Sequence, residues 1–560
     1  MSNFLSGMKA PEVAILGGGP VGVSTSIQLS RWGIPHVLFE RNRVPTQHPK
    51  SRAINVRTME IFREWGIHDA VRAAGMQRPP LRFFGRDLAS PWDHVMDSTN
   101  QYGELDDGRY SPLTLLVKLC SQDALEPILR DHALASPHAD LRFGWKVNDW
   151  RESDRGVVLE ATEIDSDRSC KVEARYLIAC DGARSKVRKR LGISCEGEDG
   201  IQEAVSVLFR SQTLAQRLGT YSAFVNINNP ETIGNAVIAP VDDEGRAALL
   251  GRPKVMDEQP FDMIDWQRQL HLALGDPQAE IDLIDTRTWQ VAVQIAQTYR
   301  AGPIFLAGDA AHLMPPNGGF NMNTGIQDIH NLCWKLAGVL RGWASPDLLD
   351  TYTSERRPVA EFNASEAVLN FESHNTSDTA GNSSFYRREH FIHPGLSLGF
   401  RYNDGALVPE PGQSPNARWT AGEYHPNAIP GARAPHIWLE RAGERISAID
   451  LFGSAFVIFG RADNPAVADV LAAAESRGIP ARAYTVGTGG DYAVSEQDWG
   501  TLYGTYSLVV IRPDGHVGLR HAELSPPTAQ EIDAWWDRLT GRKTPSARHD
   551  RHPSHMSAAG

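Results

Sequence analysis

Residues 13–40 read VAILGGGPVGVSTSIQLSRWGIPHVLFE, and this stretch decides the fold class. The apolar run from Val13 to Leu16 predicts a short strand. The residues that follow, as far as about Trp32, have the pattern of a helix, and 36–40 predicts a second strand. The stretch therefore predicts the β-α-β unit that opens an α/β domain with a parallel sheet.

The turn between the first strand and the helix, Gly17-Gly18-Gly19-Pro20-Val21-Gly22, fits the pattern G-x-G-x-x-G. In such a turn the first glycine permits the tight bend, the second lets a pyrophosphate approach the backbone, and the third lets helix and strand pack closely. Glu40 ends the second strand, where a carboxylate would accept hydrogen bonds from ribose hydroxyls. A plain glycine turn is the alternative, but strand, helix and acid in register favour a dinucleotide site. The pattern does not separate NAD from FAD.

Two later motifs decide between these cofactors. The first, CDGARSKVR at 180–188, follows the expected strand Tyr176–Ala179. The second, GDAAHLMPPNGGFNMNTGIQDIHNLCWKL at 308–336, puts an acid, two prolines and a turn-prone loop directly before a helix. An acid after a strand can hold a ribitol or ribose hydroxyl, and backbone N–H groups at a helix N-terminus can hold an anion. A simple NAD dehydrogenase needs neither motif.

Composition limits the partners of the chain. It has 560 residues and a net charge of −12, from 56 Lys and Arg against 68 Asp and Glu, which argues against nucleic acid as the main partner. The five cysteines include no Cys-x-x-Cys pair, which favours a reducing cytoplasm. His312, Asp328 and His330 lack the spacing of metal ligands, so we expect no metal site. No apolar run approaches the roughly 18 residues of a membrane span and there is no secretory signal, so we expect no membrane partner.

The pattern of strands and helices changes several times along the chain. Short alternating strands such as Val205–Phe209 and Ala236–Ala239 predict a second, sheet-based domain, and a long helical stretch is expected to run to about Phe371. We expect these boundaries: a discontinuous nucleotide-binding domain at 11–80, 110–195 and 294–395, a sheet domain at 81–109 and 196–293, a linker at 396–430, a small α/β domain at 431–542 and a disordered tail at 543–560.

With these motifs in place, the chain resembles the FAD-dependent aromatic hydroxylases over essentially residues 11–520. These are the single-component class A flavoprotein monooxygenases of the para-hydroxybenzoate and phenol hydroxylase type. The motifs GGGPVG, DGARSKVR and GDAAHLMPP…MNTGIQD occur in the order of that family. Further matching pieces are Ser51-Arg52-Ala53 followed by Glu60, Gln122-x-x-Leu125-Glu126, Asn331-Leu332 with Trp334-Lys335-Leu336, and Tyr352…Glu355-Arg356-Arg357-Pro358.

The C-terminal part resembles the thioredoxin-like domain of phenol and aromatic-polyketide hydroxylases. The resemblance rests on PGARAPH at 430–436, DLFG at 450–453 and RPDGHV at 512–517. No cysteine lies beyond Cys333, so this domain cannot perform dithiol chemistry, and a structural or homodimer-forming role is expected. The fold implied is α/β, with a Rossmann-like FAD-binding domain, an inserted β-sheet substrate domain and a C-terminal thioredoxin-like domain.

The resemblance implies a set of cofactor contacts. Gly17, Gly19, Pro20, Val21 and Gly22 would hold the FAD pyrophosphate, Glu40 the adenosine ribose, Arg41 and Arg52 the cofactor, and Gln122 its ribityl or phosphate region. Asp181 and Gly182 would serve FAD and NAD(P)H, Asp309 the ribityl hydroxyls, Pro316, Gly318 and Asn321 the flavin ring, and Met322 and Asn323, through backbone N–H groups, the flavin pyrimidine. The implied catalytic residues are Arg52, near the flavin or nicotinamide, Pro316 and Asn321.

One pair of residues departs from the family pattern. The family usually has glycine, often after glutamine, at the positions that Phe320 and Asn321 occupy here. Positive φ costs glycine nothing, and asparagine is the next most tolerant residue, so we expect the loop conformation to survive. The Asn321 side chain is then expected close to the flavin, where it would tune the chemistry. Tyr221, Phe224 and Phe320 are candidate residues of an aromatic substrate cavity, with core packing as the alternative; no general base is singled out.

The resemblance implies an NAD(P)H- and O2-dependent FAD monooxygenase. It would hydroxylate a phenolic or polycyclic, polyketide-like aromatic through a flavin C4a-hydroperoxide. Baeyer–Villiger or oxidative-rearrangement chemistry on a ketone is the alternative within the fold, kept open by Asn321. A non-catalytic flavin-binding redox scaffold is a different class, and the intact Arg52, DG and GD motifs argue against it.

Overall fold

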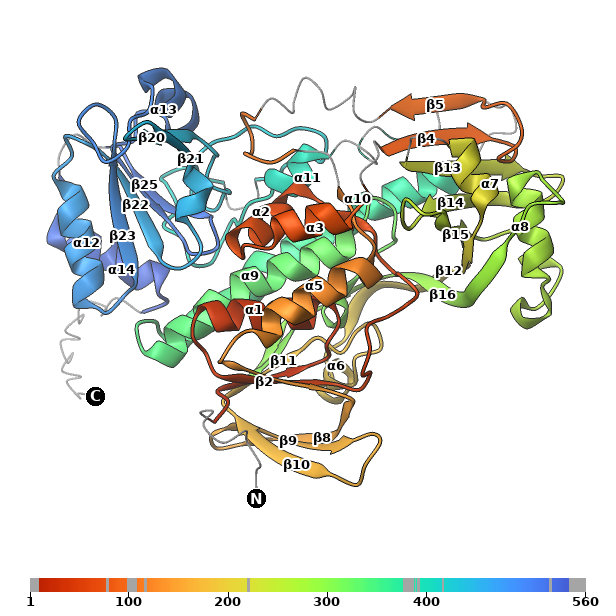
Figure 1. Ribbon diagram of the computed structural model, residues 1–560. Helices are drawn as coiled ribbons and strands as arrows, with labels where there is room; N and C mark the ends of the chain where they lie inside the picture. The colour runs from red at the N-terminus through yellow and green to blue at the C-terminus, as the bar shows by residue number, and fades with distance from the viewer. Residues whose placement is uncertain are drawn as a thin grey trace, which may run out of the picture.

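The protein folds into three units around one long helix, α9 (Phe320–Arg341) (Figure 1). The computed structural model describes residues 10–76, 80–97, 108–114, 118–218, 222–375, 387, 389, 393–414, 417–522 and 526–542. The predicted tail at 543–560 lies outside these residues. Within them, no helix is both long enough and apolar enough to cross a membrane.

The central unit is built on a six-stranded sheet. Its order is β17 (Arg300–Ala301), β18 (Ile304–Leu306), β11 (Tyr176–Ala179), β1 (Val13–Leu16), β2 (His36–Glu40) and β7 (Ala139–Phe143). All neighbours are parallel except β17 and β18. The predicted strands 13–16, 36–40 and 176–179 are confirmed with these bounds, because short runs of apolar residues suit strands that are buried on both faces.

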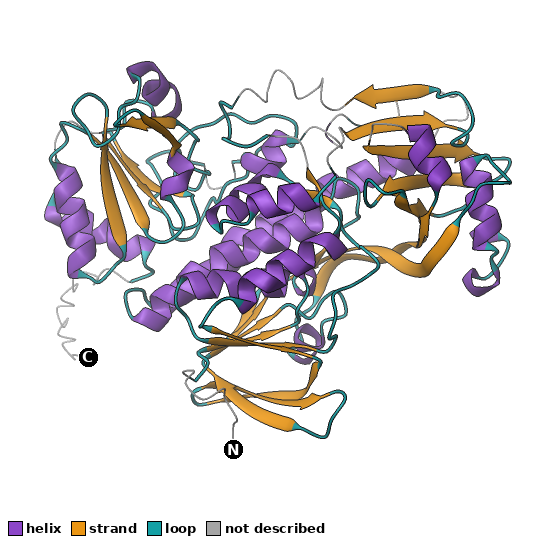
Figure 2. Ribbon diagram, in the orientation of Figure 1, coloured by secondary structure: helices purple, strands orange, loops and turns teal. Residues whose placement is uncertain are grey.

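Layers of different kinds cover the two faces of this sheet (Figure 2). Helices α1 (Pro20–Arg31), α5 (Gln122–Leu134) and α9 pack together on one face, and an antiparallel sheet of β8 (Trp145–Ser153), β9 (Gly156–Glu163) and β10 (Ser169–Ala174) lies on the other. Helix α9 is buried along almost its whole length. A helix that is apolar on most sides is stable only in such an interior position.

The predicted helical stretch to about Phe371 is confirmed, but it consists of two helices. Gly342 adopts the left-handed conformation, with φ +81°, and ends α9; a left-handed glycine commonly terminates a helix in this way. The chain turns through η4 (Pro346–Asp350) and continues as α10 (Thr351–Asn375). The other elements of the central unit are β3 (Ala53–Ile54), β6 (Lys118–Leu119), α2 (Val56–Glu64), α3 (His68–Ala74), α6 (Lys186–Arg190) and η3 (Gly308–Ala310).

The second unit is an eight-stranded sheet. Its order is β19 (His312–Leu313), β16 (Asp282–Ala296), β12 (Cys195–Arg210), β15 (Arg246–Gly251), β14 (Gly234–Pro240), β13 (Ser222–Asn229), β4 (Pro80–Gly85) and β5 (His94–Asp97). Only β13 and β4 pair in parallel. Strands β12 and β16 are much longer than the short strands predicted, and they connect this sheet with the central unit (Figure 1).

Alternation along β12 gives this sheet two different faces. Val205, Val207 and Phe209 belong to a core that includes Trp266 and Leu270 of α8 (Trp266–Leu274). Because side chains alternate along a strand, the residues between them point to the opposite face. The remaining helices of this unit are α7 (Gln212–Leu218), η1 (Lys254–Asp257) and η2 (Phe261–Met263).

The third unit has the strand order of a thioredoxin-like domain. Strand β22 (Phe456–Arg461) is followed by α12 (Ala466–Ser476) and the parallel strand β23 (Ala481–Val486). After α13 (Glu496–Tyr503), strands β24 (Leu508–Ile511) and β25 (Val517–His521) extend the sheet in antiparallel fashion, before α14 (Ala529–Leu539). The hairpin β20 (Trp438–Arg441) and β21 (Glu444–Ser447), with η6 (Ala448–Leu451), completes it. The predicted fold class is confirmed.

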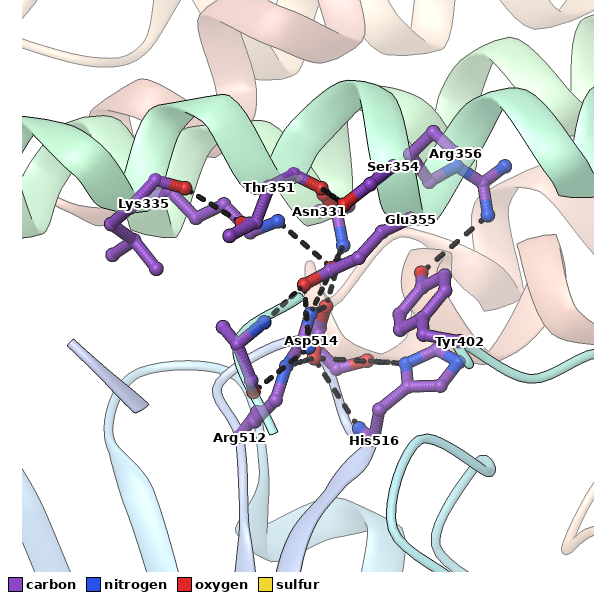
Figure 3. Close-up of polar contacts among 12 residues, drawn as sticks. Asn331, Lys335, Thr351, Ser354, Glu355, Arg356, Tyr402, Arg512, Asp514 and His516 are labelled. Carbon is purple, nitrogen blue, oxygen red and sulfur yellow. Dashed lines mark hydrogen bonds and ion pairs between the residues drawn. The ribbon is translucent and has the colours of Figure 1, made fainter. Parts of the chain in front are cut away.

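The segment before the third unit has little regular structure but much buried surface. It contains the short helix α11 (Pro394–Leu398), and Leu396, Phe400, Tyr402 and Leu407 are buried. The stretch therefore packs into the core between the central and third units, where its tyrosine faces Arg356 of α10 (Figure 3).

Candidate active site

The glycine-rich turn before α1 has the three predicted kinds of glycine. Gly17 has φ +106°, and a Cβ there would lie 2.2 Å from the carbonyl oxygen of Cys180. A Cβ on Gly22 would lie 1.9 Å from the carbonyl oxygen of Gly17. A Cβ on Gly19 would meet no protein atom within 4 Å. Gly17 and Gly22 are therefore required for close backbone packing, whereas Gly19 leaves room for a ligand at the N-terminus of α1.

A fourth glycine in the turn is required for a reason that the motif does not express. A Cβ on Gly18 would lie 2.6 Å from the Cβ of Glu40. The Glu40 carboxylate accepts hydrogen bonds from the backbone N–H groups of Gly18 and Asn42, both at 2.7 Å. The predicted ribose acid thus lies directly beside the glycine turn, whereas the neighbouring Arg41 is exposed.

The three sequence motifs converge in space. A Cβ on Gly308 would lie 2.9 Å from Val21 Cγ2, and a Cβ on Gly325 would lie 2.7 Å from the same atom. Helix α1, the GD loop and α9 can meet here only because two of the contacting residues have no side chain. Arg188 joins the DG motif to the GD motif, since its Nη1 donates to the carbonyl oxygen of Ala310 at 2.9 Å.

Within the DG motif, Asp181 is half satisfied. Its Oδ2 accepts hydrogen bonds from the N–H groups of Lys186 and Val187 at the start of α6, at 2.8 and 3.2 Å. Its Oδ1 is buried and has no partner among the residues described. Gly182 has φ +81°, and a Cβ there would meet nothing within 4 Å. A free acceptor beside open space fits the predicted ligand contact.

Arg52 is the clearest candidate for contact with a charged ligand. Its Nε and Nη2 are buried and have no hydrogen-bond partner in the described part of the chain. Burial lowers the pKa of Arg52 to about 10, against the opposing charge of Asp123. A buried cation without partners is costly, and the negative charge and acceptor atoms of a dinucleotide cofactor would satisfy it.

Gln122, which is also predicted to contact the cofactor, is held in place by hydrogen bonds with the N–H group of Lys50 and with Glu126, at 3.2 and 2.6 Å.

The loop before α9 depends on two glycines. Gly318 has φ +101°, and a Cβ there would lie 2.3 Å from the ring of Phe320. Gly319 has φ +70°, and a Cβ there would lie 2.6 Å from the Cβ of Ala53. Pro316, predicted against the flavin ring, is exposed and accepts the N–H of Gly319 through its carbonyl oxygen at 2.9 Å. The loop thus passes directly beside the segment that carries Arg52.

The first turn of α9 presents free backbone donors. No side chain in the described residues caps this helix. The side chain of Asn323 instead accepts the N–H of Asn55 at 3.0 Å and donates to the carbonyl oxygen of Ala53 at 2.9 Å. Met322 is nearly buried in the same turn. An uncapped helix N-terminus favours a partial negative charge, as the predicted contact with the flavin pyrimidine requires.

The side chain of Asn321 lies between two buried polar groups. Its Nδ2 donates to Asp309 Oδ1 at 2.8 Å, and its Oδ1 lies 3.0 Å from Nδ1 of His312. Both of its amide atoms therefore have partners within the protein, and one partner, Asp309, is the residue predicted to hold the ribityl chain of FAD. That Asn321 lies close to the flavin stays a prediction.

The aromatic candidates for the substrate cavity differ in how far they are buried. Phe320 is only 2% exposed and its ring packs edge-on against His393, with centroids 5.0 Å apart, so it offers almost no surface to a substrate, and the core-packing alternative describes it better. Phe224 is half-buried on the face of β13 opposite to the core residue Val225, and the guanidinium of Arg82 lies 4.4 Å from its ring centroid. Tyr221 lies outside the described residues.

A buried histidine that no sequence motif singles out lies at the boundary of two units. His48 Nδ1 lies 2.9 Å from Asp285 Oδ2, and His48 Nε2 lies 2.7 Å from the hydroxyl of Ser206. His48 and Ser206 are buried, whereas the side chain of Asp285 is 36% exposed. Burial lowers the pKa of His48, against the effect of its hydrogen bond to the Asp285 carboxylate, so the imidazole is neutral at neutral pH. These residues form a hydrogen-bonded array, here called the His48 array.

The three members of the His48 array are far apart in the sequence. His48 precedes Arg52 in the same loop, while Ser206 and Asp285 come from β12 and β16. Ser206 lies between Val205 and Val207, so it points to the face of the sheet opposite to the α8 core. No spacing pattern could reveal the array; only the position of His48 four residues before the predicted Arg52 gave a local signal. In the described residues no group of three or more His, Cys, Asp or Glu is arranged to hold a metal ion.

Comparisons with known proteins identify the family of this chain. A family profile described as "FAD binding domain" matches residues 10–367, and one described as "Aromatic-ring hydroxylase, C-terminal" matches residues 427–542. The chain is 34% identical over 567 residues to the tetracenomycin A2 monooxygenase-dioxygenase of Streptomyces glaucescens. The alignment covers 95% of this chain and 97% of that protein.

Solved structures of flavin-dependent monooxygenases are also similar to this chain. Aklavinone-11 hydroxylase in complex with FAD and aklavinone aligns with a TM-score of 0.84 and 29% identity, over 96% of this chain and 100% of that chain. The flavin-dependent monooxygenase PieE in complex with FAD and substrate aligns with a TM-score of 0.85 and 28% identity, again over 96% and 100%. The chain therefore belongs to the FAD-dependent aromatic-ring hydroxylases and is an FAD-dependent monooxygenase.

Proposed function

We propose that this monooxygenase uses NAD(P)H and O2 to hydroxylate a phenolic ring of a polycyclic, polyketide-like substrate. Support for the substrate class comes from the relatives, whose names include a tetracenomycin monooxygenase-dioxygenase and a hydroxylase bound to aklavinone. The observation that carries the proposal is the His48 array, because it supplies the base that hydroxylation of a phenol needs.

A phenol becomes a stronger carbon nucleophile when its hydroxyl loses a proton, and a positioned base of suitable pKa accelerates that loss. In our proposal the substrate hydroxyl hydrogen-bonds to Ser206, on the face of the sheet turned away from the α8 core. The proton passes from the substrate to Ser206 Oγ while the Ser206 proton passes to His48 Nε2. Asp285 then accepts the proton at His48 Nδ1 and releases it to water, since its carboxylate is partly exposed.

The predicted cofactor residues fit FAD in this arrangement. Gly19 and the N-terminus of α1 would face the pyrophosphate, Glu40 the adenosine ribose, and Asp309 the ribityl chain. The free donors of Arg52 and the uncapped turn of α9 would face the flavin. The bound FAD supplies the redox chemistry, for which we propose the C4a-hydroperoxide route with NAD(P)H as hydride donor. The overall balance is Ar–H + NAD(P)H + H⁺ + O2 giving Ar–OH + NAD(P)⁺ + H2O.

The chain's own residues would support this chemistry in two ways. The positive end of the α9 dipole favours the negative charge that a reduced flavin carries. Arg52 lies in a segment joined to α9 by the side-chain bonds of Asn323, so it can contact the cofactor and the incoming nicotinamide. We also retain the predicted domain boundaries as a proposal, with the eight-stranded sheet as the substrate domain.

The Baeyer–Villiger alternative was kept open by Asn321, whose amide bonds to Asp309 and His312. No contact in the described residues favours this reaction over hydroxylation. We therefore propose no second reaction.

The test is a product experiment. The purified flavoprotein is incubated with NADH or NADPH and a panel of phenols and polycyclic phenolic quinones under ¹⁸O2. The expected result is substrate-stimulated NAD(P)H oxidation and a product that carries one ¹⁸O in a ring hydroxyl. A lactone or cleaved ring would contradict hydroxylation, and NAD(P)H oxidation that no aromatic stimulates, without oxygenated product, would favour a redox scaffold.

A further inference from the structure

Asn321 belongs to a chain of buried polar contacts that reaches from the GD loop to α10. It bonds to Asp309 on one side and to His312 on the other. His312 Nε2 lies 2.7 Å from Asp328 Oδ2, and Asp328 Oδ1 accepts from Nε of Arg356 at 2.9 Å. His312, Asp328 and Arg356 are completely buried. In Figure 3, Arg356 is seen to extend from α10 toward Tyr402.

The hydrogen bonds determine the charge of the histidine. A carboxylate accepts only, so Asn321 must donate to Asp309 through Nδ2 and must accept from His312 through Oδ1. Nδ1 of His312 therefore carries a proton. Nε2 faces the Asp328 carboxylate, another acceptor, and carries a proton as well. Burial lowers the pKa of His312, but the Asp328 charge and these hydrogen bonds raise it overall. These contacts favour the imidazolium form of the ring.

The pKa of Asp309 is raised overall. Burial raises it, and the charges of His312 and Lys50 and the hydrogen bond from Asn321 offset this effect only in part. The other charged groups nearby are Asp328 on α9 and Arg356 on α10, which pair with each other. Arg188 of α6 donates to the carbonyl oxygen of Ala310, the residue directly after Asp309, and adds positive charge at the same loop. Among the contacts described, Asn321 provides the bonded connection between the acid and the imidazolium.

We propose that Asn321 is a positioning residue that links the Asp309 carboxylate to the buried charge of His312, so that Asp309 stays ionised to hold the FAD ribityl chain. An ionised carboxylate accepts stronger hydrogen bonds from hydroxyls than a neutral acid does. The inference rests on the proposed placement of the ribityl chain at Asp309 and is independent of the substrate and of the His48 array.

The sign of the pH effect follows directly. FAD binding that needs ionised Asp309 is lost as the pH falls through the pKa of that group. Without the Asn321 bridge this pKa rises, so FAD should be lost at a higher pH. A shift of one pKa unit corresponds to about tenfold in affinity well below the pKa.

The experiment measures FAD release from the diluted holoprotein by flavin fluorescence between pH 4 and pH 9. Asn321→Leu and, as a milder second variant, Asn321→Gly should move the midpoint of release up by about one pH unit, with little change at the alkaline end. His312→Gln should do the same, because it removes the charge. The control is Asn363→Leu, which removes another buried amide beside α9, bonded to Thr324, and should leave the midpoint in place.

Each outcome has a definite meaning. A wild-type midpoint in both Asn321 variants, or equal weakening at every pH, would overturn the proposal, because a merely structural residue would act without pH dependence. Asp309→Ala separates this failure from a wrong placement of the cofactor. If Asp309→Ala retains FAD as wild type does, then the ribityl chain is not at Asp309, whatever the Asn321 variants show.

Discussion

Arg512 of the third unit and Glu355 of α10 form a completely buried, two-point ion pair (Figure 3). Nη1 lies 3.0 Å from Oε1 and Nη2 lies 2.7 Å from Oε2. Lys335 of α9 also donates to Glu355 at 2.8 Å, and Asp514 lies against Arg512. The thioredoxin-like domain is therefore joined by charge to the two helices that follow the flavin loop, which gives this domain a structural role.

Arg512→Met should destabilise the protein strongly. Removing one partner leaves Asp514 and Glu355 with less compensation in a buried site, which costs about 3–5 kcal/mol. The control is Arg86→Met, whose pair with Glu231 lies at the surface and should cost less than about 1 kcal/mol. Urea unfolding of both variants measures the difference. Equal small losses would show that the buried pair contributes no more than an exposed one.

The same cluster predicts loss of stability in acid. Burial raises the pKa of Glu355, but Arg512 and Lys335 outweigh it and lower the pKa to about 2, from 4.5. A carboxyl whose pKa is lowered on folding stabilises the protein fully above its unfolded pKa, and this contribution is lost as the pH falls from 4.5 toward 2. The urea midpoint of wild type should therefore fall more steeply between pH 5 and pH 3 than that of Glu355→Gln. Parallel curves would contradict the lowered pKa.

Two glycines of one motif should respond in opposite ways. Gly22→Ala places a methyl group 1.9 Å from the carbonyl oxygen of Gly17 and should lower the stability of the protein, because backbone must move. Gly19→Ala meets no protein atom and should fold normally but retain FAD poorly, since the methyl group occupies the space expected for the pyrophosphate. Thermal unfolding and flavin content separate the two effects. Normal flavin content in folded Gly19→Ala would remove the pyrophosphate from this position.

Local patterns predicted the central unit well. The strands 13–16, 36–40 and 176–179 are short apolar runs next to glycine or acidic motifs, and the sequence defines both of their ends. The break at Gly342 was not assigned from the sequence, although a glycine followed a few residues later by Pro346 is an ordinary signal of a helix end. The length of β12 and β16 was also not predicted, because the N-terminal half of each strand is polar and largely exposed.

The candidate site was predictable where a backbone motif defines it and not where side chains from distant segments meet. Gly17, Gly22 and Asp181 could be assigned by motif. Asn321 was recognised as unusual in the sequence. The orientation of its side chain, however, depends on His312, which is in turn held by Asp328 farther along α9. The His48 array joins three segments of two units, and only the packed structure brings them together.

His48→Gln should remove the proposed base. The rate constant kcat with a phenolic substrate should fall by about 10²- to 10⁴-fold near neutral pH, with a smaller effect on KM. The deficit should shrink as the pH approaches the pKa of the phenol, because the substrate then ionises in water. His36→Gln is the matched control: His36 is also buried and bonded to a serine, at 2.6 Å, but lies on β2 within the central sheet. Product formation measured from pH 6 to pH 10 tests this.

Asp285→Asn should act through His48 and change the pH profile. The carboxylate raises the pKa of His48 against the effect of burial. Activity needs neutral His48, so kcat/KM of wild type falls on the acidic side as this pKa is crossed. Without the carboxylate the acidic limb should move to lower pH while the maximum rate falls, since the proton has no acceptor near the surface. An unchanged acidic limb, or a rate loss in His36→Gln as large as in His48→Gln, would show that the array does not carry the substrate proton.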